Sequence, residues 1–505
     1  MTVSAPNPYD QFAYRTLPMA QTHPDRLATI ALLHGMSPRP VDRCRVLELG
    51  CGDGSNLIPM AYGLPGSEFV GVDLAATAVA AGAAAVSALG LRNIALHRLD
   101  IMEVSDALGA FDYIIAPGIY SWVPAPVRDR ILAICQAHLA PQGVAFVSYN
   151  TYPGCHLRRA VWEILQFHVE DIADAGERIA QARAFARFMA ECPQAEGSDA
   201  AVLRDEMRAV LDHSPGLLFH DDLAPVNFPV YFHEFAAHAR RHRLQFLAEA
   251  DVHEMQPHVY PPEIAEQILR LANGSVVQKE QYLDFLRNRR FRQTLLCRAD
   301  VALDRAPRRE IARTLYVGSS ARPAAERPDV DSPDVIEEFR GHGDSTMATD
   351  HPLAKAAMLH LGRVWPRVVD VDELLRAIGR GGADAAGSDS LLDILLAAYS
   401  AGFLDLHTRA PHFALEPGPR PTASPVARLQ LERGPFVASL RHTSVRIDDD
   451  LGRRLLGLMD GTRTVEMLRR DLETHVSAPG SPVEIGAADV ERKVTEIARL
   501  ALLIA

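Results

Sequence analysis

A glycine-rich turn after a short apolar run is the feature that most restricts how this chain can fold. Residues 45–56 read Arg-Val-Leu-Glu-Leu-Gly-Cys-Gly-Asp-Gly-Ser-Asn. The apolar positions fit a buried strand, and Gly50, Gly52 and Gly54 allow a tight turn that a ligand can approach closely. Such a loop at the end of a first strand forms the cofactor crevice of a doubly wound sheet. We therefore predict an α/β protein with a Rossmann-like core.

Acidic residues in this loop distinguish between two kinds of nucleotide ligand. Dinucleotide loops hold a pyrophosphate at a helix N-terminus, but Glu48 and Asp53 would lie beside that group here. At ~4 Å and an effective dielectric of ~20, two like charges repel by roughly 4 kcal/mol. S-adenosylmethionine instead carries an ammonium, a sulfonium and a ribose diol, which suit carboxylates. The loop therefore favours this methyl donor, and a dinucleotide is the alternative.

The next two predicted strands each end in an acid that can complete a nucleoside site. Asp73 can accept hydrogen bonds from both ribose hydroxyls, or it can cap the alanine-rich helix that follows. Asp100 can accept from the adenine amino group while Ile101 packs on the ring, or it can lie on an exposed turn. The full set expected around S-adenosylmethionine is Glu48, Gly50, Cys51, Gly52, Asp53, Asn56, Asp73, Leu74, Asp100, Ile101 and Pro117.

Aromatic residues gather just beyond the fourth and fifth predicted strands, where ligands of such sheets bind. The candidate catalytic residues there are Tyr120, Trp122, Tyr149, Asn150 and Tyr152. Methyl transfer from a sulfonium is an in-line displacement that mainly requires alignment of the reactants. An aromatic, partly dry pocket would lower the pKa of a lysine acceptor, and Asn150 or Tyr149 would aim its nitrogen. Any one of the four rings alone fits a core position equally well.

Six short motifs resemble, in this order, those of bacterial methyltransferases that carry a methyltransferase regulatory domain. They lie at residues 9–10, 22–24, 47–54, 111–115, 120–124 and 148–154. This group of class I S-adenosylmethionine-dependent enzymes includes the rickettsial outer-membrane-protein lysine methyltransferases, and the matches extend over most of residues 8–300. The resemblance implies a protein lysine as acceptor and a homodimer. Pro117 and Cys155 depart from it, because a histidine and a tryptophan are expected there.

Composition, spacing and the resemblance, which implies the regulatory domain, divide the 505 residues into seven segments. Residues 316–350 and 411–425 are rich in residues typical of linkers, and the helix and strand order after the first of them resembles a winged helix. The predicted segments are a donor-binding core over 1–155, a helical segment and candidate dimerisation element over 156–214, a regulatory domain that adds to the sheet over 215–310, a linker over 311–350, a winged-helix-like module over 351–410, a linker over 411–426 and a second small module over 427–505.

Three local patterns have alternative interpretations. Residues 27–33 have helical spacing and predict a helix that packs on the sheet, or a flap that brings Tyr14 or His23 to the donor. Residues 156–191 predict a long amphipathic helix or a pair, which buries its stripe within the chain or against a second subunit. His233 and His238 are five residues apart, which misses the four-residue zinc spacing. We therefore expect no metal site.

The overall balance of residues limits location and partners. The net charge of −12 argues against a general nucleic-acid binder, and no apolar run is long enough to cross a bilayer. Six cysteines without close pairs indicate a reducing compartment, and the first residues lack the order of a secretion signal. We therefore expect a cytoplasmic protein without membrane insertion.

Three functions fit these patterns. The first is methylation of a protein lysine or another nucleophile, with S-adenosylmethionine as donor and S-adenosylhomocysteine as product. The second is methylation of a small molecule in a biosynthetic pathway, with the C-terminal modules as a docking platform. The third is a catalytically silent regulator that binds the donor.

Overall fold

A seven-stranded sheet forms the centre of the molecule in the computed structural model, which describes residues 16–505 except 194–196, 344, 380–384 and 477–485. The strand order is β3-β2-β1-β4-β5-β7-β6. The strands are β1 (Arg45–Leu49), β2 (Glu68–Asp73), β3 (Ile94–Arg98), β4 (Phe111–Ala116), β5 (Leu139–Asn150), β6 (Leu244–Glu249) and β7 (Phe291–Arg298). Strands β1 to β5 run parallel, and β7 is antiparallel to β5 and β6. This confirms the predicted Rossmann-like sheet, whose order reverses between β1 and β4.

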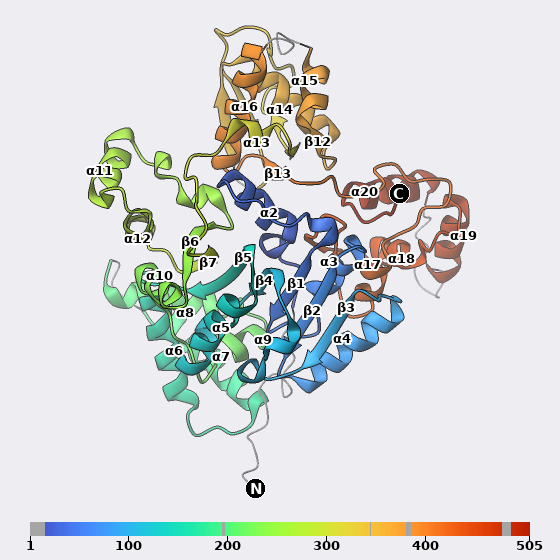
Figure 1. Ribbon diagram of the computed structural model, residues 1–505. Helices are drawn as coiled ribbons and strands as arrows, with labels where there is room; N and C mark the ends of the chain where they lie inside the picture. Colours follow the sequence, from blue (N-terminus) through green and yellow to red (C-terminus); the bar gives the residue numbers. More distant parts are fainter. Residues whose placement is uncertain (1–15, 194–196, 344, 380–384, 477–485) are drawn as a thin grey trace.

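Helices cover both faces of the sheet, which explains why its parallel strands are apolar throughout. Successive residues of a strand point to opposite faces. Val46 packs with α2 (Pro24–Leu33) and α3 (Leu57–Gly63), whereas the next residue, Leu47, packs with α5 (Ala125–His138). A further helix, α4 (Ala76–Ala88), lies against β3 (Figure 1). The carboxyl ends of the five parallel strands therefore form one edge between two layers of helices.

The N-terminal segment forms the helix that its spacing predicts. Helix α2 is almost wholly buried, and the Nδ1 of His23 accepts a hydrogen bond from the backbone of Asp25 at its start. The packed helix is therefore confirmed for residues 24–33. Tyr14 lies outside the described residues.

The middle of the chain folds into helices that share a core of their own. Helices α6 (Cys155–Val169), α7 (Ala175–Glu191) and α8 (Asp199–Val210) pack together. The predicted pair of amphipathic helices is confirmed, and its apolar stripe is buried within the chain. Phe167 and Phe188 remain 81% and 62% exposed.

Residues 215–310 complete the sheet and add helices beside it, beginning with the short α9 (Pro215–Leu217). Strands β6 and β7 extend the sheet beyond β5, as expected. Helix α10 (Phe232–Arg241) packs against the sheet, and α11 (Pro262–Ala272) and α12 (Val276–Arg287) follow. Glu234 accepts a hydrogen bond from the backbone of Tyr231 at the start of α10, so it acts as a helix cap.

The prediction of a linker at 311–350 is wrong. This segment contains β8 (Tyr316–Gly318), β9 (Arg322–Pro323), β10 (Glu337–Arg340) and β11 (Thr346–Thr349). Strand β8 pairs with β12 (Val369–Asp370) and β13 (Asp405–His407), which belong to the next module. Phe339 is fully buried in that module's core. The linker prediction was based on the polar composition of the segment, which does not show that a few of its apolar residues are buried.

Two small modules follow, one at the top of Figure 1 next to α2 and one at the right next to α3. The first consists of α14 (Pro352–Val364), α15 (Val371–Ile378) and α16 (Ala385–Ser400) with the β12-β8-β13 sheet. The second consists of α17 (Pro425–Leu431), the hairpin β14 (Phe436–Ala438) and β15 (Ser444–Arg446), α18 (Asp450–Leu458), α19 (Val465–Val476) and α20 (Ala487–Arg499). The predicted linker 411–426 is corrected at its end, since Thr422 and Ala423 already pair with this second module.

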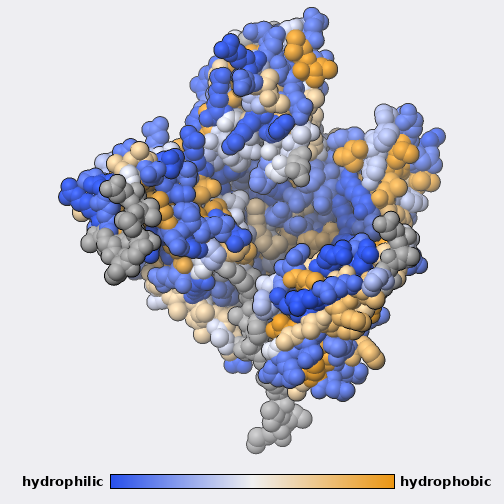
Figure 2. All heavy atoms as spheres, turned by 180° about the vertical axis from the view of Figure 1, so that it is seen from behind, coloured by the Kyte–Doolittle hydropathy of each residue, from blue (hydrophilic) through white to orange (hydrophobic). Residues whose placement is uncertain are grey.

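The face of the molecule seen in Figure 2 is mostly hydrophilic, with separate hydrophobic patches. Within the described residues, every helix is too short or too polar to cross a membrane.

Candidate active site

The glycine turn after β1 adopts a backbone that few other residues tolerate. Gly50, Gly52 and Gly54 have φ of 75°, 54° and 73°, in the left-handed region where a side chain is strained. A Cβ on Gly54 would also lie 2.9 Å from a methyl of Leu96. The turn therefore brings bare backbone to the edge of the sheet, where a ligand can lie against it.

Glu48 is the most perturbed acid in this crevice. Its side chain is buried, and Oε1 accepts a hydrogen bond of 3.0 Å from the Asn56 amide. The other oxygen, Oε2, is buried without a hydrogen-bond partner among the described residues. Burial, together with the charges of Asp73 and Asp53, raises the pKa of Glu48 to about 8. An unpaired buried carboxylate oxygen is costly, so this group is suited to a cationic ligand that donates hydrogen bonds.

The other acids fix the loop itself. Asp73 accepts from the backbone of Gly52 and of Ala75, each at 2.8 Å, which ties the ends of β1 and β2 together. It therefore stabilises the turn before α4, whose N-cap is Ala75. Asp100, for which an exposed turn was the alternative, accepts from the Met102 backbone at 2.9 Å and caps the short helical turn after β3.

Two distant parts of the chain cover the loop. The Thr16 hydroxyl donates to Asp53 at 2.7 Å, and the Met19 backbone donates to the Asn56 side chain at 3.0 Å. From the second C-terminal module, Arg433 pairs with Asp53 at 3.2 Å, and His442 lies 3.0 Å from the Asn56 oxygen. The glycine loop is thus closed from the N-terminal segment and from the β14–β15 hairpin.

The remaining predicted donor residues line the same edge. Ile101 is buried, whereas the side chain of Leu74 is 53% exposed beside Asp73. Cys51 is buried, and burial raises the pKa of its thiol, so it serves as an apolar neighbour. Pro117 is half-buried in the turn after β4, where the Gly118 backbone donates to the Ser148 hydroxyl at 2.7 Å.

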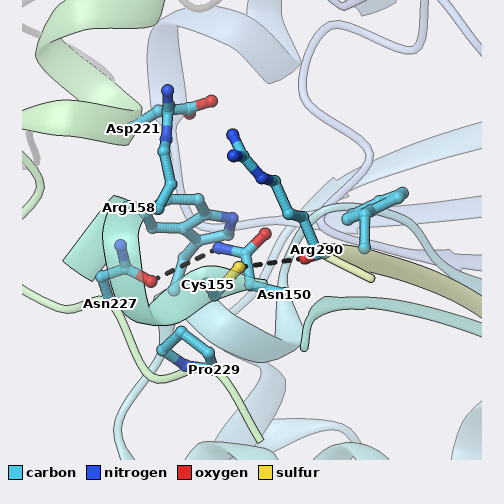
Figure 3. Close-up of a pocket in the computed structure, with 9 residues that line it drawn as sticks. Asn150, Cys155, Arg158, Asp221, Asn227, Pro229 and Arg290 are labelled. Atoms are coloured by element: carbon cyan, nitrogen blue, oxygen red, sulfur yellow. Dashed lines mark hydrogen bonds between the residues drawn. The ribbon is translucent and has the colours of Figure 1, made fainter. Parts of the chain in front are cut away.

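A cavity of about 180 Å³ opens at the carboxyl ends of β4 and β5 (Figure 3). The residues that line it are Trp122, Asn150, Cys155, Arg158, Asp221, Asn227, Pro229, Arg290 and Phe291. Asn150 donates to Asn227 at 3.3 Å, and the Cys155 thiol donates to the Arg290 carbonyl at 3.0 Å. The cavity is therefore built jointly by the parallel sheet, helix α6 and residues 215–310.

Charged groups surround the cavity. Burial and the neighbouring Asp222 raise the pKa of Asp221 to about 6. Arg158 pairs with Asp222 at 2.9 Å, and Arg290 pairs with Glu206 through two hydrogen bonds. The cavity thus presents one carboxyl group, whose pKa is raised, and two guanidinium groups, each paired with a further carboxylate.

Comparison with known proteins identifies the segments of this architecture. Family models match as a methyltransferase domain over residues 47–145, a predicted methyltransferase regulatory domain over 214–298 and a PKMT C-terminal winged helix domain over 419–499. This chain belongs to the S-adenosylmethionine-dependent methyltransferases that carry a methyltransferase regulatory domain. The domain over 47–145 contains the glycine turn and the acids described above, so the predicted donor class is confirmed.

Relatives and solved structures agree with this family. One uncharacterised protein of Rickettsia prowazekii is 36% identical over 71% of this chain, and the match spans only 65% of that protein's length. A second from the same organism is 32% identical over 47% of this chain and 96% of its own length. The structure of PKMT2 from Rickettsia typhi covers 97% of this chain and 100% of its own, with 24% identity and a TM-score of 0.86. That protein has also been solved in complex with AdoHcy. At this identity, the likeness establishes the fold.

The structure of this methyltransferase separates the predicted aromatic residues. Trp122 and Asn150 line the cavity. Tyr120 and Tyr149 are instead buried in the core, where they contact each other and Phe235 from α10, and Tyr149 stacks on the Phe235 ring at 4.1 Å. Tyr152 stacks on His156 at 4.1 Å. The expectation of one open aromatic pocket is therefore corrected, because two of its rings are packed in the core against a ring of the regulatory domain.

Sequence reasoning missed the residues that reach the site from other domains. Arg433 and His442 lie nearly 400 residues from the loop they contact, and Arg158, Asn227 and Arg290 join the cavity only through the fold. Neither composition nor spacing marks these positions, and only the tertiary arrangement identifies them.

Proposed function

We propose that this protein transfers a methyl group from S-adenosylmethionine to the side-chain amine of a lysine in a protein substrate. The methyltransferase and regulatory domains support the reaction class. The match of the C-terminal module to a PKMT winged helix domain supports a protein acceptor. The bound donor supplies an electrophilic methyl group on a sulfonium, which a nucleophile displaces in line.

The unpaired oxygen of Glu48 is the observation that carries the assignment of the donor site. A buried carboxylate with a free acceptor fits the ammonium of the donor's amino-acid end, and a phosphate there would be repelled. We assign Asp73 to the ribose hydroxyls, and Asp100 with Ile101 to the adenine. The backbone of Gly50 and Gly52 allows the ligand to lie close to the turn.

The charges around the cavity act in both directions on a lysine acceptor. Deprotonating a lysine with a pKa of ~10.4 at pH 7 costs roughly 4–5 kcal/mol. The ring of Trp122 lowers this cost by excluding water from the amine, whereas Arg158 and Arg290 contribute little because each is paired with a carboxylate. The Asp221 carboxyl group can accept a hydrogen bond from the entering ammonium and hold the nitrogen in line.

Replacing Trp122 by alanine tests the cavity as the acceptor site. We expect at least tenfold slower methyl transfer to protein, because the ring that forms one wall is lost. Affinity for S-adenosylhomocysteine should stay unchanged, since Trp122 is not among the residues of the glycine loop. Single-turnover labelling and calorimetry measure the two quantities. An unchanged transfer rate would place the acceptor elsewhere.

Replacing His442 by alanine tests the contribution of the β14–β15 hairpin to donor binding. Loss of its contact with Asn56, whose amide in turn holds Glu48, removes one neutral hydrogen bond worth about 0.5–1.5 kcal/mol. We expect two- to tenfold weaker binding of S-adenosylhomocysteine by calorimetry. Arg446→Ala, an exposed change on the same hairpin, is the matched control and should bind as the parent does. Equal affinities for parent and H442A would contradict the coupling.

A second candidate is a small-molecule acceptor that carries a carboxylate, because two arginines line the cavity. Cell lysate incubated with the protein and radiolabelled donor separates the candidates. Label in a protein band supports the lysine acceptor, and label confined to the small-molecule fraction supports the second candidate. No label despite tight donor binding would indicate a catalytically silent regulator.

We further infer a homodimer, for which the exposed Phe167 and Phe188 on the helical segment offer apolar contact area. Size-exclusion chromatography with light scattering tests this. A monomeric mass at micromolar concentration would contradict it.

A further inference from the structure

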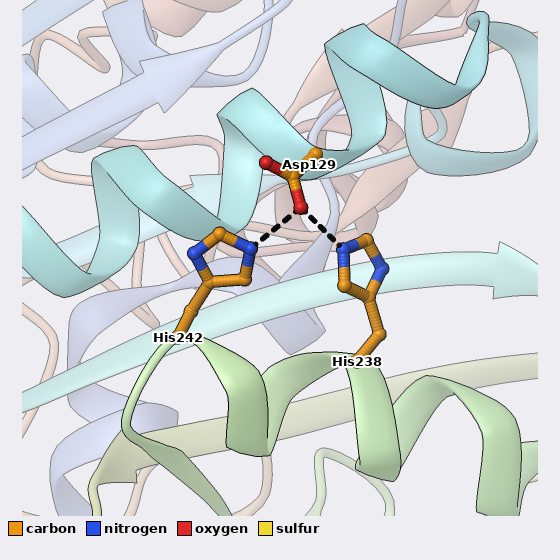
Figure 4. Close-up of side chains that lie close together, drawn as sticks. All are labelled: Asp129, His238 and His242. Atoms are coloured by element: carbon orange, nitrogen blue, oxygen red, sulfur yellow. Dashed lines mark hydrogen bonds and ion pairs between the residues drawn. The ribbon is translucent and has the colours of Figure 1, made fainter.

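Asp129, His238 and His242 form a cluster apart from the donor loop and the cavity (Figure 4). The Nε2 atoms of the two imidazoles lie 3.0 Å and 2.8 Å from the same carboxylate oxygen, Oδ1 of Asp129. One ligand atom from each residue lies within 4.8 Å of the others. Within the described residues, no other group of three such side chains meets this spacing. Asp129 belongs to α5, whereas the histidines come from the end of α10.

His238 and His242 have the four-residue spacing of zinc-binding helices, which His233 and His238 lack. His238 and His242 are four residues apart, so both rings project from one side of the helix end. Their Nε2 atoms converge on a carboxylate that lies over a hundred residues earlier in the chain. In a tetrahedral site with bonds of about 2.0–2.1 Å, ligand atoms lie roughly 3.4 Å apart. The observed separations need only small side-chain shifts to reach this geometry.

Tyr120 orients one of the rings. Its hydroxyl lies 2.7 Å from Nδ1 of His238. When Nε2 of His238 binds a cation, Nδ1 carries the proton and donates to the tyrosine oxygen. A second hydrogen bond of this kind fixes the tautomer and ring orientation of metal-binding histidines. The buried tyrosine thus holds the His238 ring in the orientation in which Nε2 is free to bind a cation.

The exposure and charge of the cluster suit a cation that keeps a solvent position. The Asp129 side chain is 58% exposed, and those of His238 and His242 are 13% and 17% exposed. The charge of Asp129 favours a cation here, and the charge of the neighbouring Arg241 opposes it.

We propose that Asp129, His238 and His242 bind a divalent cation of the zinc type. Two imidazoles and one carboxylate are ligands that zinc commonly takes, with water in the fourth position. The cation would join α5 of the methyltransferase domain to α10 of the regulatory domain. It would also hold the ring of His238 against Tyr120, next to the loop that follows β4.

Zinc titration of the whole protein, after dialysis against a chelator, tests this proposal. We expect one equivalent of Zn²⁺ per chain by calorimetry, visible absorption bands when Co²⁺ is added instead, and a higher melting temperature with Zn²⁺ present. Asp129→Asn and His242→Gln should each weaken zinc binding at least tenfold. His258→Gln, at an exposed histidine of the same domain, should bind as the parent does.

A further variant separates a metal site from a simple ion pair. Tyr120→Phe leaves all three ligands in place, and we expect it to weaken zinc binding about tenfold or more while one equivalent is still bound. The proposal is overturned if the parent binds no zinc stoichiometrically, or if D129N and H242Q bind it as tightly as the parent. Because Asp129 is exposed, D129N retains a folded test protein even if H242Q does not fold.

Discussion

Replacing Glu48 by glutamine is expected to weaken the binding of S-adenosylhomocysteine by about ten- to a hundredfold. Glutamine has nearly the same shape and can keep a hydrogen bond with the Asn56 amide. It loses the negative charge that faces the ligand's ammonium. A hydrogen bond to a charged group contributes about 1.5–3 kcal/mol, and each 1.4 kcal/mol is a factor of about ten in affinity.

The same carboxylate should make donor binding depend on pH. Burial raises the pKa of Glu48 to about 8 in the free protein, so the group is mostly protonated at pH 6. The ligand's ammonium binds the ionised form, and the protonated form must first lose its proton. Affinity should therefore rise by up to about tenfold per pH unit from pH 6 to pH 8 and then level off. In E48Q it should stay nearly constant over this range.

Calorimetry at pH 6, 7 and 8 on the parent and the variant measures both effects. Glu68→Gln is the matched control, because Glu68 is exposed at the opposite end of β2 and pairs with Arg45. This control should keep the parent's affinity and pH dependence. Parent-like affinity in E48Q, or a pH dependence that survives the substitution, would remove Glu48 from the donor site.

Replacing Arg292 by alanine is expected to lower the free energy of unfolding by about 3–5 kcal/mol. The arginine is fully buried and lies 2.8 Å from Asp284, 2.6 Å from Glu249 and 3.2 Å from Glu280. Its guanidinium also stacks over Phe232 at 4.0 Å. Removal of one partner from a buried ion pair leaves uncompensated charge, which costs about this much. Glu249 loses its cationic partner here, whereas Asp284 keeps Arg289 and Glu280 keeps Lys279.

The effect should appear as a lower melting temperature of the sheet domain. For a domain of this size, each kcal/mol shifts the midpoint by roughly 2–4 °C, so the expected fall is on the order of 10 °C by circular dichroism. Arg313→Ala removes an exposed pair with Asp372 and should leave the midpoint nearly unchanged, as surface pairs contribute little. A midpoint for R292A within two degrees or so of the parent would contradict the role of this network.

The sequence predicted correctly those elements whose structure depends on a short run of residues. The apolar run at 45–49, the glycine turn and the amphipathic spacing of α6 and α7 each specify structure within a short window. The linker prediction for residues 311–350 failed because the strands there are short and depend on single buried residues such as Phe339, while most residues of the segment are exposed and polar. The composition of a segment reflects its many exposed residues and does not reveal the few that are buried.

Site residues at the end of a single strand could be predicted from the sequence. Contacts made by residues from another domain could not. The acids Glu48, Asp73 and Asp100 end or adjoin β1, β2 and β3, as the topology requires. The burial of Tyr120 and Tyr149 depends on Phe235, which enters from α10. Spacing cannot reveal a ring that arrives from another domain.

Calorimetric titration of the unmodified protein with S-adenosylhomocysteine and, separately, with NADH tests the central claim most directly. A glycine turn bordered by buried carboxylates should bind the first ligand saturably, at one equivalent per chain, and give no measurable heat with the phosphate-bearing second. Tight binding of NADH with no response to S-adenosylhomocysteine would contradict this account.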